Sequence, residues 1–243
     1  IWYNKCMFVG ILFTFLVSFV IGVFSLLTFR SYYTINSRYA SQAVTSFAFF
    51  WLGMAGSWFS IACMDFFRYL RFQQVAIIVT YCLQIFIGAS LVIGAYFVQE
   101  VLSEGRKRKT VLVVYGIWYL FFLVSLFFYK VELQPENYFA AQIISSPATL
   151  GLFIVGFFPL WAGAVVLFVR SIKNKAKLPE PVRHSYLFMA VSLILIGLAG
   201  ALDETGIVYG WMVTVMRLIT LISSIVAYTA LSGLRKPDEM VIE

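Results

Sequence analysis

The stretch IVYGWMVTVMRLITLISSIVAYTALSGL, residues Ile207–Leu234, is apolar or weakly polar at every position except Arg217. It is longer than the roughly 20 residues that a helix needs to cross a bilayer core. A base ten residues into such a stretch costs about 3 kcal/mol or more unless it meets a partner or water. Arg217 therefore predicts a polar contact inside a bundle of membrane-spanning helices.

Six other apolar stretches are each near the roughly 20 residues that a span requires. They are Cys6–Phe29, Ala43–Phe66, Val75–Val98, Val111–Tyr129, Ala148–Val169 and Ser185–Leu202. Each is predicted to be a helix, because backbone polar groups in hydrocarbon must bond within their own segment. Of all residues, 62% are hydrophobic and only 12% are charged, against about a quarter charged in soluble domains. The predicted fold class is an all-α polytopic membrane protein, with seven transmembrane helices forming a single domain over residues 1–243.

Lysine and arginine are distributed unequally between the two sides of the predicted membrane. One side would hold thirteen of them: Arg30, Arg38, Arg106, Lys107, Arg108, Lys109, Arg170, Lys173, Lys175, Lys177, Arg183, Arg235 and Lys236. The other side would hold four: Lys5, Arg68, Arg71 and Lys130. Cytoplasmic loops carry the excess of these residues. The N-terminus is therefore predicted outside and the C-terminus inside.

The formal net charge of +7 does not require a nucleic-acid partner. Basic residues beside an anionic leaflet each gain about 1 kcal/mol from its surface potential. We expect the lipid bilayer as the partner, with anionic lipids at the basic cytoplasmic loops, and no nucleic acid. The loop Gly105–Lys109 is either a determinant of topology or a contact for lipid or another protein.

Two connections between the predicted spans carry specific expectations. Only Phe67–Gln74 separates spans two and three, so a tight turn is expected there. The connection after span four contains Asn137–Ile144, which is predicted to be an amphipathic segment lying on the membrane surface.

The last predicted span has a polar face. Small polar, aromatic and charged residues recur along it at spacings of three, four or seven, which places them on one side of a helix. They are Gly210, Thr214, Arg217, Ser224, Tyr228 and Ser232. This face is expected to point into the bundle, where an acid from another helix would be the natural partner of Arg217.

Three acids near the outer ends of predicted spans could pair with Arg217: Asp65, Asp203 and Glu204. At 1.5 Å per residue, Arg217 lies roughly 15 Å below the start of its span, whereas Asp203 and Glu204 lie in the tight turn above it. Asp65 lies deeper if its helix continues beyond it, and it is therefore the better candidate. Gln84 is predicted at nearly the depth of Arg217 and offers an uncharged partner.

Two interpretations of these residues remain open. Asp65, Gln84 and Arg217 could line an outward-facing cavity for a ligand, an ion or a proton, with Asp203 and Glu204 at its mouth. Alternatively, the buried polar contact only determines how the helices pack.

Several chemistries are disfavoured by what the chain lacks. His184 is the only histidine, so it cannot by itself build a bis-histidine haem, a histidine-rich di-iron centre or a multi-histidine zinc site. No Walker or dinucleotide-binding loop occurs. The last span has no lysine, which excludes a retinal Schiff base of the microbial-rhodopsin kind in its usual place. We expect no enzyme activity, no cofactor and no metal.

Seven spans with the N-terminus outside suggest receptors, but the motifs of the rhodopsin-like G-protein-coupled receptors are missing. Predicted span three ends in Gln99-Glu100-Val101 in place of Asp-Arg-Tyr. Predicted span seven ends in Tyr228-Thr229-Ala230-Leu231, with no Asn-Pro-x-x-Tyr. Membership of that family is not expected.

Three other features are similar to a different group of seven-span proteins. They are Arg68-Tyr69-Leu70 before span three, Arg183-His184-Ser185 at the start of span six, and Ala227-Tyr228-Thr229-Ala230-Leu231 ahead of Arg235. With these features the chain resembles the N-terminal sensor module of many prokaryotic histidine kinases. The resemblance implies spans that sense an external or membrane-borne signal, in the plasma membrane of a prokaryote, and pass it to cytoplasmic signalling domains.

The first functional hypothesis is therefore a non-enzymatic sensor or receptor-like input module. The alternative is an accessory or structural subunit of a larger membrane complex, which would bring other membrane subunits as partners. A transporter comes third, because neither a clear internal repeat nor a broken helix pair is visible. A signalling domain encoded beyond Glu243 would favour the sensor, and stable partners in a mild-detergent purification would favour the subunit.

Overall fold

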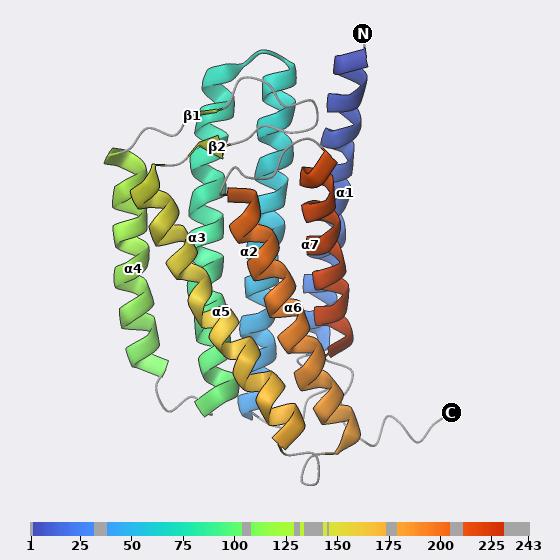
Figure 1. Ribbon diagram of the computed structural model, residues 1–243, viewed down its shortest axis with the longest axis vertical. Helices are drawn as coiled ribbons and strands as arrows, with labels where there is room; N and C mark the ends of the chain where they lie inside the picture. The colour runs from blue at the N-terminus through green and yellow to red at the C-terminus, as the bar shows by residue number, and fades with distance from the viewer. Residues whose placement is uncertain are drawn as a thin grey trace.

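The computed structural model describes the backbone of residues 2–31, 38–103, 108–128, 132–133, 143–144, 146–173, 179–204 and 211–230. Over these residues the chain forms seven helices and one short ribbon of two strands (Figure 1). The helices are α1 (Trp2–Ser31), α2 (Arg38–Tyr69), α3 (Gln73–Ser103), α4 (Arg108–Phe128), α5 (Pro147–Lys173), α6 (Glu180–Glu204) and α7 (Trp211–Ala230). The strands are β1 (Glu132–Leu133) and β2 (Ile143–Ile144).

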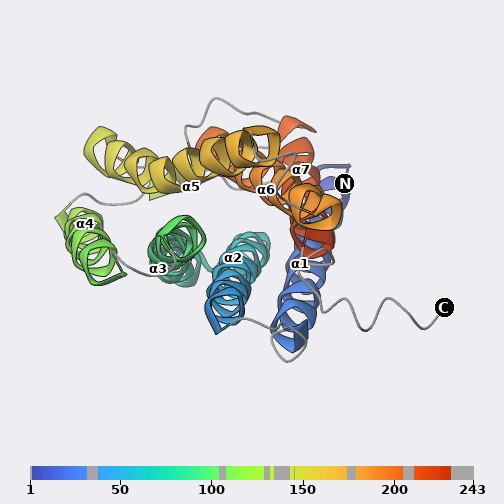
Figure 2. The same cartoon turned by 90° about the horizontal axis from the view of Figure 1, so that it is seen from below.

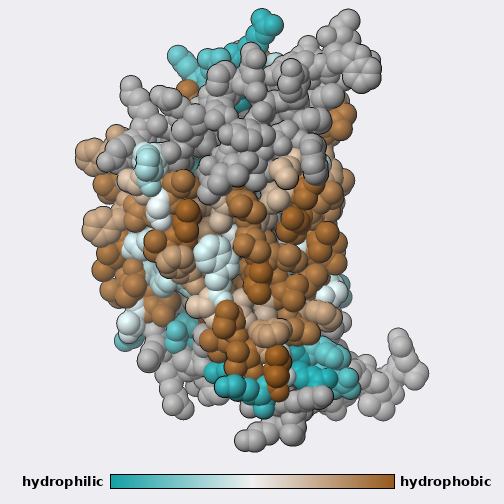
Figure 3. Space-filling view, in the orientation of Figure 1, coloured by the Kyte–Doolittle hydropathy of each residue, from teal (hydrophilic) through white to brown (hydrophobic). Residues whose placement is uncertain are grey.

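The helices have the length and polarity of membrane spans, and the predicted fold class is confirmed. Helices α1 to α6 are each long and apolar enough to cross a bilayer, and the apolar part of α7 that the structure describes is Thr214–Ala230. A belt of hydrophobic side chains crosses the middle of the face shown in Figure 3, with hydrophilic side chains toward both ends. Large side chains such as Phe19 and Phe128 point outward, 70% and 81% exposed, as expected for a surface that lipid covers.

The bundle is closed by the contact of its last helix with its first. Helices α1 to α4 follow one another along one side, and α5, α6 and α7 return along the other until α7 meets α1 (Figures 1 and 2). Helix α2 packs against both α1 and α3, while α4 contacts α3 and α5 at the edge of the bundle. This closure brings α1, α2 and α7 together, although α7 lies at the opposite end of the chain.

Close packing of α2 on α3 depends on Gly53. A Cβ atom at that position would overlap the Oγ atom of Ser90, so no larger side chain fits without a shift. Thr80 of α3 donates a hydrogen bond to the sulfur of Met64 on α2 at 3.1 Å. The two contacts hold the helices in one register and determine the depth of the residue after Met64, which is Asp65.

The short turn predicted between spans two and three is present. Helix α2 ends in a Schellman motif, in which Phe72 N donates to Phe67 O at 2.8 Å and Arg71 N donates to Arg68 O at 2.9 Å. Arg71 has a φ of 65°, a left-handed conformation that glycine usually occupies at this position. The turn therefore contains a strained, exposed arginine.

Arg71→Gly is expected to stabilise the protein by about 1 kcal/mol, because glycine adopts the left-handed conformation without the Cβ clash. Arg71→Ala removes the same side chain but keeps the clash, so it serves as the matched control and should leave stability nearly unchanged. Unfolding in mixed micelles with increasing sodium dodecyl sulfate measures both. Equal stability of the two variants would contradict the assignment of strain to the backbone.

The ribbon follows α4 and precedes α5. Its strands are antiparallel, with Glu132 opposite Ile144 and Leu133 opposite Ile143. The expectation of an amphipathic surface segment over Asn137–Ile144 stays a prediction; at its C-terminal end, Ile143–Ile144 form a strand. Two β-branched residues suit a strand. Their partners in the ribbon, Glu132 and Leu133, lie too far away in the sequence for helical periodicity to predict the pairing. Residues 137–142 lie outside the part of the chain that the structure describes.

The two ends of the bundle differ in charge. The α2–α3 turn and the ribbon mark one end, which the lysine and arginine distribution predicts to be outside, and which we call the outer end. Among the described side chains, Arg68 and Arg71 lie at the outer end. The basic side chains described at the opposite end are Arg30, Lys109, Arg170, Lys173 and Arg183.

The orientation can be measured with single cysteines. In a variant in which Cys6, Cys63 and Cys82 are replaced by alanine, Arg71→Cys and Lys173→Cys each add one exposed thiol at opposite ends. A membrane-impermeant maleimide should label position 71 in intact cells and position 173 only after permeabilisation. The reverse pattern would show that the outer end faces the cytoplasm.

Candidate functional site

Helix α7 turns a polar face inward. Arg217, Thr220 and Ser224 are buried, with Arg217 only 3% exposed, whereas Leu218, Ile222 and Ile225 of the opposite face are exposed. Thr214 and Tyr228 of the predicted polar face are partly buried, and Gly210 and Ser232 lie outside the described residues. Thr220 and Ser223 also belong to the buried face, although they are not among the residues predicted for the polar face.

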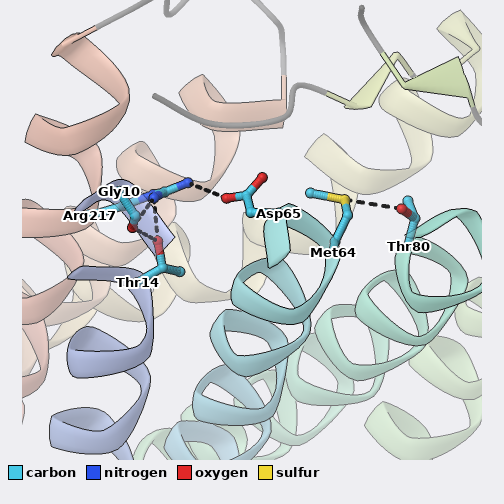
Figure 4. A network of polar contacts seen from close by, with 6 residues as sticks. All are labelled: Gly10, Thr14, Met64, Asp65, Thr80 and Arg217. Atoms are coloured by element: carbon cyan, nitrogen blue, oxygen red, sulfur yellow. Dashed lines mark hydrogen bonds and ion pairs between the residues drawn. The ribbon is translucent and has the colours of Figure 1, made fainter. Parts of the chain in front are cut away.

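The guanidinium of Arg217 reaches two other helices. Its Nη1 atom donates to the Gly10 carbonyl of α1 at 3.2 Å and to the Thr14 hydroxyl. Its Nη2 atom donates to Asp65 Oδ2 of α2 at 3.3 Å, forming an ion pair in which both side chains are almost fully buried. Figure 4 shows the guanidinium between α1 and the carboxylate of Asp65. The cluster thus joins α1, α2 and α7.

The contribution of α1 was not foreseen. The hydroxyl of Thr14 accepts a hydrogen bond from Arg217 Nη1 and donates one to the Gly10 carbonyl at 2.8 Å. One small side chain thus provides a partner for both the guanidinium and the carbonyl. A signal for it was present in the sequence. Thr14, Ser18, Ser25 and Thr28 recur at spacings of three, four and seven, which places them on one helical face, and all four are buried.

Helix direction explains why these side chains converge. Side chains lean toward the N-terminus of their helix. Helix α7 runs inward from the outer end, so Arg217 leans outward. Helices α2 and α6 run toward the outer end, so Asp65 and Asp203 lean inward. The positive charge of Arg217 and the negative charges of Asp65 and Asp203 are therefore brought closer together along the direction from one end of the bundle to the other.

The structure separates the other predicted residues from the guanidinium. Asp203 is partly buried and feels the charges of both Arg217 and Asp65, but it makes no ion pair with Arg217. Ser223 donates to the Ser192 carbonyl at 2.8 Å, which fixes the register of α6 against α7. Counted from that contact, the Cα atom of Asp203 lies roughly 7 Å further out than that of Arg217.

Gln84 and Glu204 have different places. Gln84 is buried on α3, one helical turn inward from Thr80, and receives no hydrogen bond from Arg217. Glu204 is the last residue of α6, and its side chain lies outside what the structure describes. Among the described residues, Asp65 alone of the three acids contacts Arg217.

The cluster contains groups that can bind a polar ligand or hold helices together. Within the described ranges, no group of three His, Cys, Asp or Glu side chains could hold a metal ion. What the cluster offers is a permanently charged donor with five N–H groups, two carboxylates, and a low dielectric that strengthens every polar contact.

The Asp65–Arg217 pair should show strong energetic coupling. Asp65→Asn and Arg217→Gln each leave the partner charge buried and are expected to cost about 3 kcal/mol. The double variant should cost at least about 1 kcal/mol less than the sum. Unfolding in mixed detergent micelles measures the cycle.

The control cycle uses a much less buried pair on α6, in which Arg183 Nη2 lies 3.8 Å from Glu180 Oε1 and the two side chains are 24% and 73% exposed. Exposed pairs of this kind couple by about 0.5 kcal/mol or less. Additive effects in the Asp65–Arg217 cycle would show that the two side chains do not interact in the folded protein.

Comparison with known proteins supports the fold. No protein-family model matches the chain, and no curated protein matches it. Among solved structures, the crystal structure of squid rhodopsin is similar, with a TM-score of 0.59 at 13% sequence identity over 94% of this chain and 82% of the rhodopsin chain. Together with the length and apolar character of its helices, this likeness shows a seven-helix integral membrane protein whose helices are arranged similarly to those of squid rhodopsin. At this identity the likeness extends to the arrangement of helices and no further.

Proposed function

We propose that this protein is a non-enzymatic membrane sensor, with the polar cluster at its outer end as the sensing site. The observation that carries the proposal is the buried Asp65–Arg217 ion pair. Replacing a buried pair by well-packed apolar residues is often neutral or stabilising, so stability alone does not require it. Charged residues inside a membrane more often serve ligands, ions or protons.

The cluster is well placed to affect the relative positions of three helices. Arg217 belongs to α7, its carboxylate partner to α2, and its remaining acceptors to α1. A ligand that binds the guanidinium would change how strongly α7 is held to α1 and α2 at the outer end. A ligand can shift a conformational equilibrium only by such a difference in contacts between the two states.

Contacts along α7 extend from the cluster toward the opposite end. Ser223 bonds to the Ser192 carbonyl of α6, and further on the ring of Tyr228 lies 5.3 Å from that of Phe24 on α1. Tyr228 is eleven residues beyond Arg217, or about 16 Å along the helix. Movement of α7 at the outer end would therefore change the environment of Tyr228.

The resemblance to the sensor modules of prokaryotic histidine kinases supports the same function. It adds the plasma membrane of a prokaryote as the expected location and a cytoplasmic signalling domain as the expected recipient. The helix arrangement shared with squid rhodopsin is compatible with this function.

Coupling between the two ends can be measured by ¹⁹F NMR. Trifluoromethyl-phenylalanine at position 228, in protein reconstituted in nanodiscs, reports on the contact with Phe24. Asp65→Asn should change the ¹⁹F shift or split the resonance, because it weakens the hold of α2 on α7. Glu180→Gln, which removes an exposed carboxylate, is the matched control. An unchanged spectrum in a folded Asp65→Asn variant would indicate that the Asp65–Arg217 pair serves only helix packing.

A further inference from the structure

One edge of the Arg217 guanidinium is only half used. The Nη1 atom has two acceptors and Nη2 has one, but the Nε atom is buried and has no hydrogen-bond partner among the described residues. Nε and Nη2 form the edge that binds a carboxylate through two parallel hydrogen bonds. Here Asp65 contacts that edge through a single oxygen at 3.3 Å. A buried N–H without an acceptor is costly.

Asp203 is an acceptor without a donor, whereas the Nε atom of Arg217 is a donor without an acceptor. Within the described part of the chain, its carboxylate takes part in no hydrogen bond and no ion pair, although it is partly buried at the outer end of α6. The charges of Arg217 and Asp65 both act on it. A carboxylate that is partly removed from water and receives no hydrogen bond is in an unfavourable environment.

We infer that the site formed by Arg217 and Asp203 binds a small molecule of the amino-acid class. In such a molecule a protonated amine lies close to a carboxylate or carbonyl oxygen. The oxygen would complete the Nε–Nη2 edge of Arg217, and the ammonium group would pair with Asp203. This inference rests on the proposed sensing function and names the ligand class of the same site.

Charge favours this class over simpler occupants. Asp65 and Asp203 together with Arg217 carry a net charge of −1, so a simple anion would meet more repulsion than attraction. A simple cation would satisfy Asp203 and leave the Nε–H of Arg217 without an acceptor. A molecule carrying both groups satisfies both deficits without adding a negative charge to the site.

Binding can be tested with the protein in nanodiscs. The common L-amino acids are tested singly for a rise in thermal unfolding temperature, followed by calorimetry for those that raise it. The best of them is then compared with the matched amine, which lacks the carboxylate, and with the matched acid, which lacks the amine. For alanine these probes are ethylamine and propionate. Each single-group probe should bind at least ten-fold more weakly than the amino acid.

Asp203→Asn is the decisive variant, because Asp203 has no partner to lose within the described residues. The variant should fold with unchanged or higher thermal stability, yet bind the amino acid at least ten-fold more weakly. Glu180→Gln removes an exposed carboxylate from the other end of α6 and should leave binding unchanged.

The outcomes separate the ligand class from the function. Equal affinity of the wild type and Asp203→Asn for every probe, or no binding of any amino acid, would overturn the inference. If the spectrum at position 228 still responds to Asp65→Asn in that case, the sensing function stands and only the ligand class fails. An amino acid that binds through Asp203 without altering that spectrum would support the site and contradict the sensor.

Discussion

A guanidinium keeps its charge inside a protein, so a helix that carries Arg217 into the membrane needs acceptors around it. The bundle supplies them from two helices far away in the sequence, a carboxylate on α2 and a carbonyl with a hydroxyl on α1. These contacts require α7 to close against α1 and α2 with one rotation and one depth. The closed arrangement of the seven helices and the location of the candidate site therefore depend on the same interaction.

Elsewhere the polar side chains inside the bundle mostly satisfy themselves locally. Thr28 donates to the carbonyl four residues earlier, and Thr220 does the same on α7. Such hydroxyls can lie inside a membrane at little cost because they need no partner from another helix. The cluster of Thr14, Asp65, Arg217 and Asp203 differs, because it joins two buried opposite charges on separate helices. Among the described residues, the Nε atom of Arg217 and the carboxylate of Asp203 also have no hydrogen-bond partner. This incompleteness is the reason for proposing a binding site there.

The choice of Asp65 over Asp203 shows how far counting along a helix can go. A rise of 1.5 Å per residue was enough to place Asp203 above Arg217, and the structure has Asp65 in contact with the guanidinium and Asp203 further out. The same counting placed Gln84 near the depth of Arg217, yet Arg217 donates no hydrogen bond to Gln84. Depth is a property of one helix, whereas contact also depends on how each helix is rotated about its axis and which helix lies beside it.

Hydropathy and charge along the sequence determined the all-helical class, the number and approximate limits of the membrane spans, and the inward direction of the polar face of α7. Each of these depends only on how a short stretch of sequence interacts with the lipid bilayer. Tertiary structure alone decided that α1 supplies Gly10 and Thr14, that Ile143–Ile144 pair as a strand, and that Arg71 adopts a left-handed conformation in the turn. These features join residues through the packing of neighbouring elements, and the periodicity of a single helix contains no information about its neighbours.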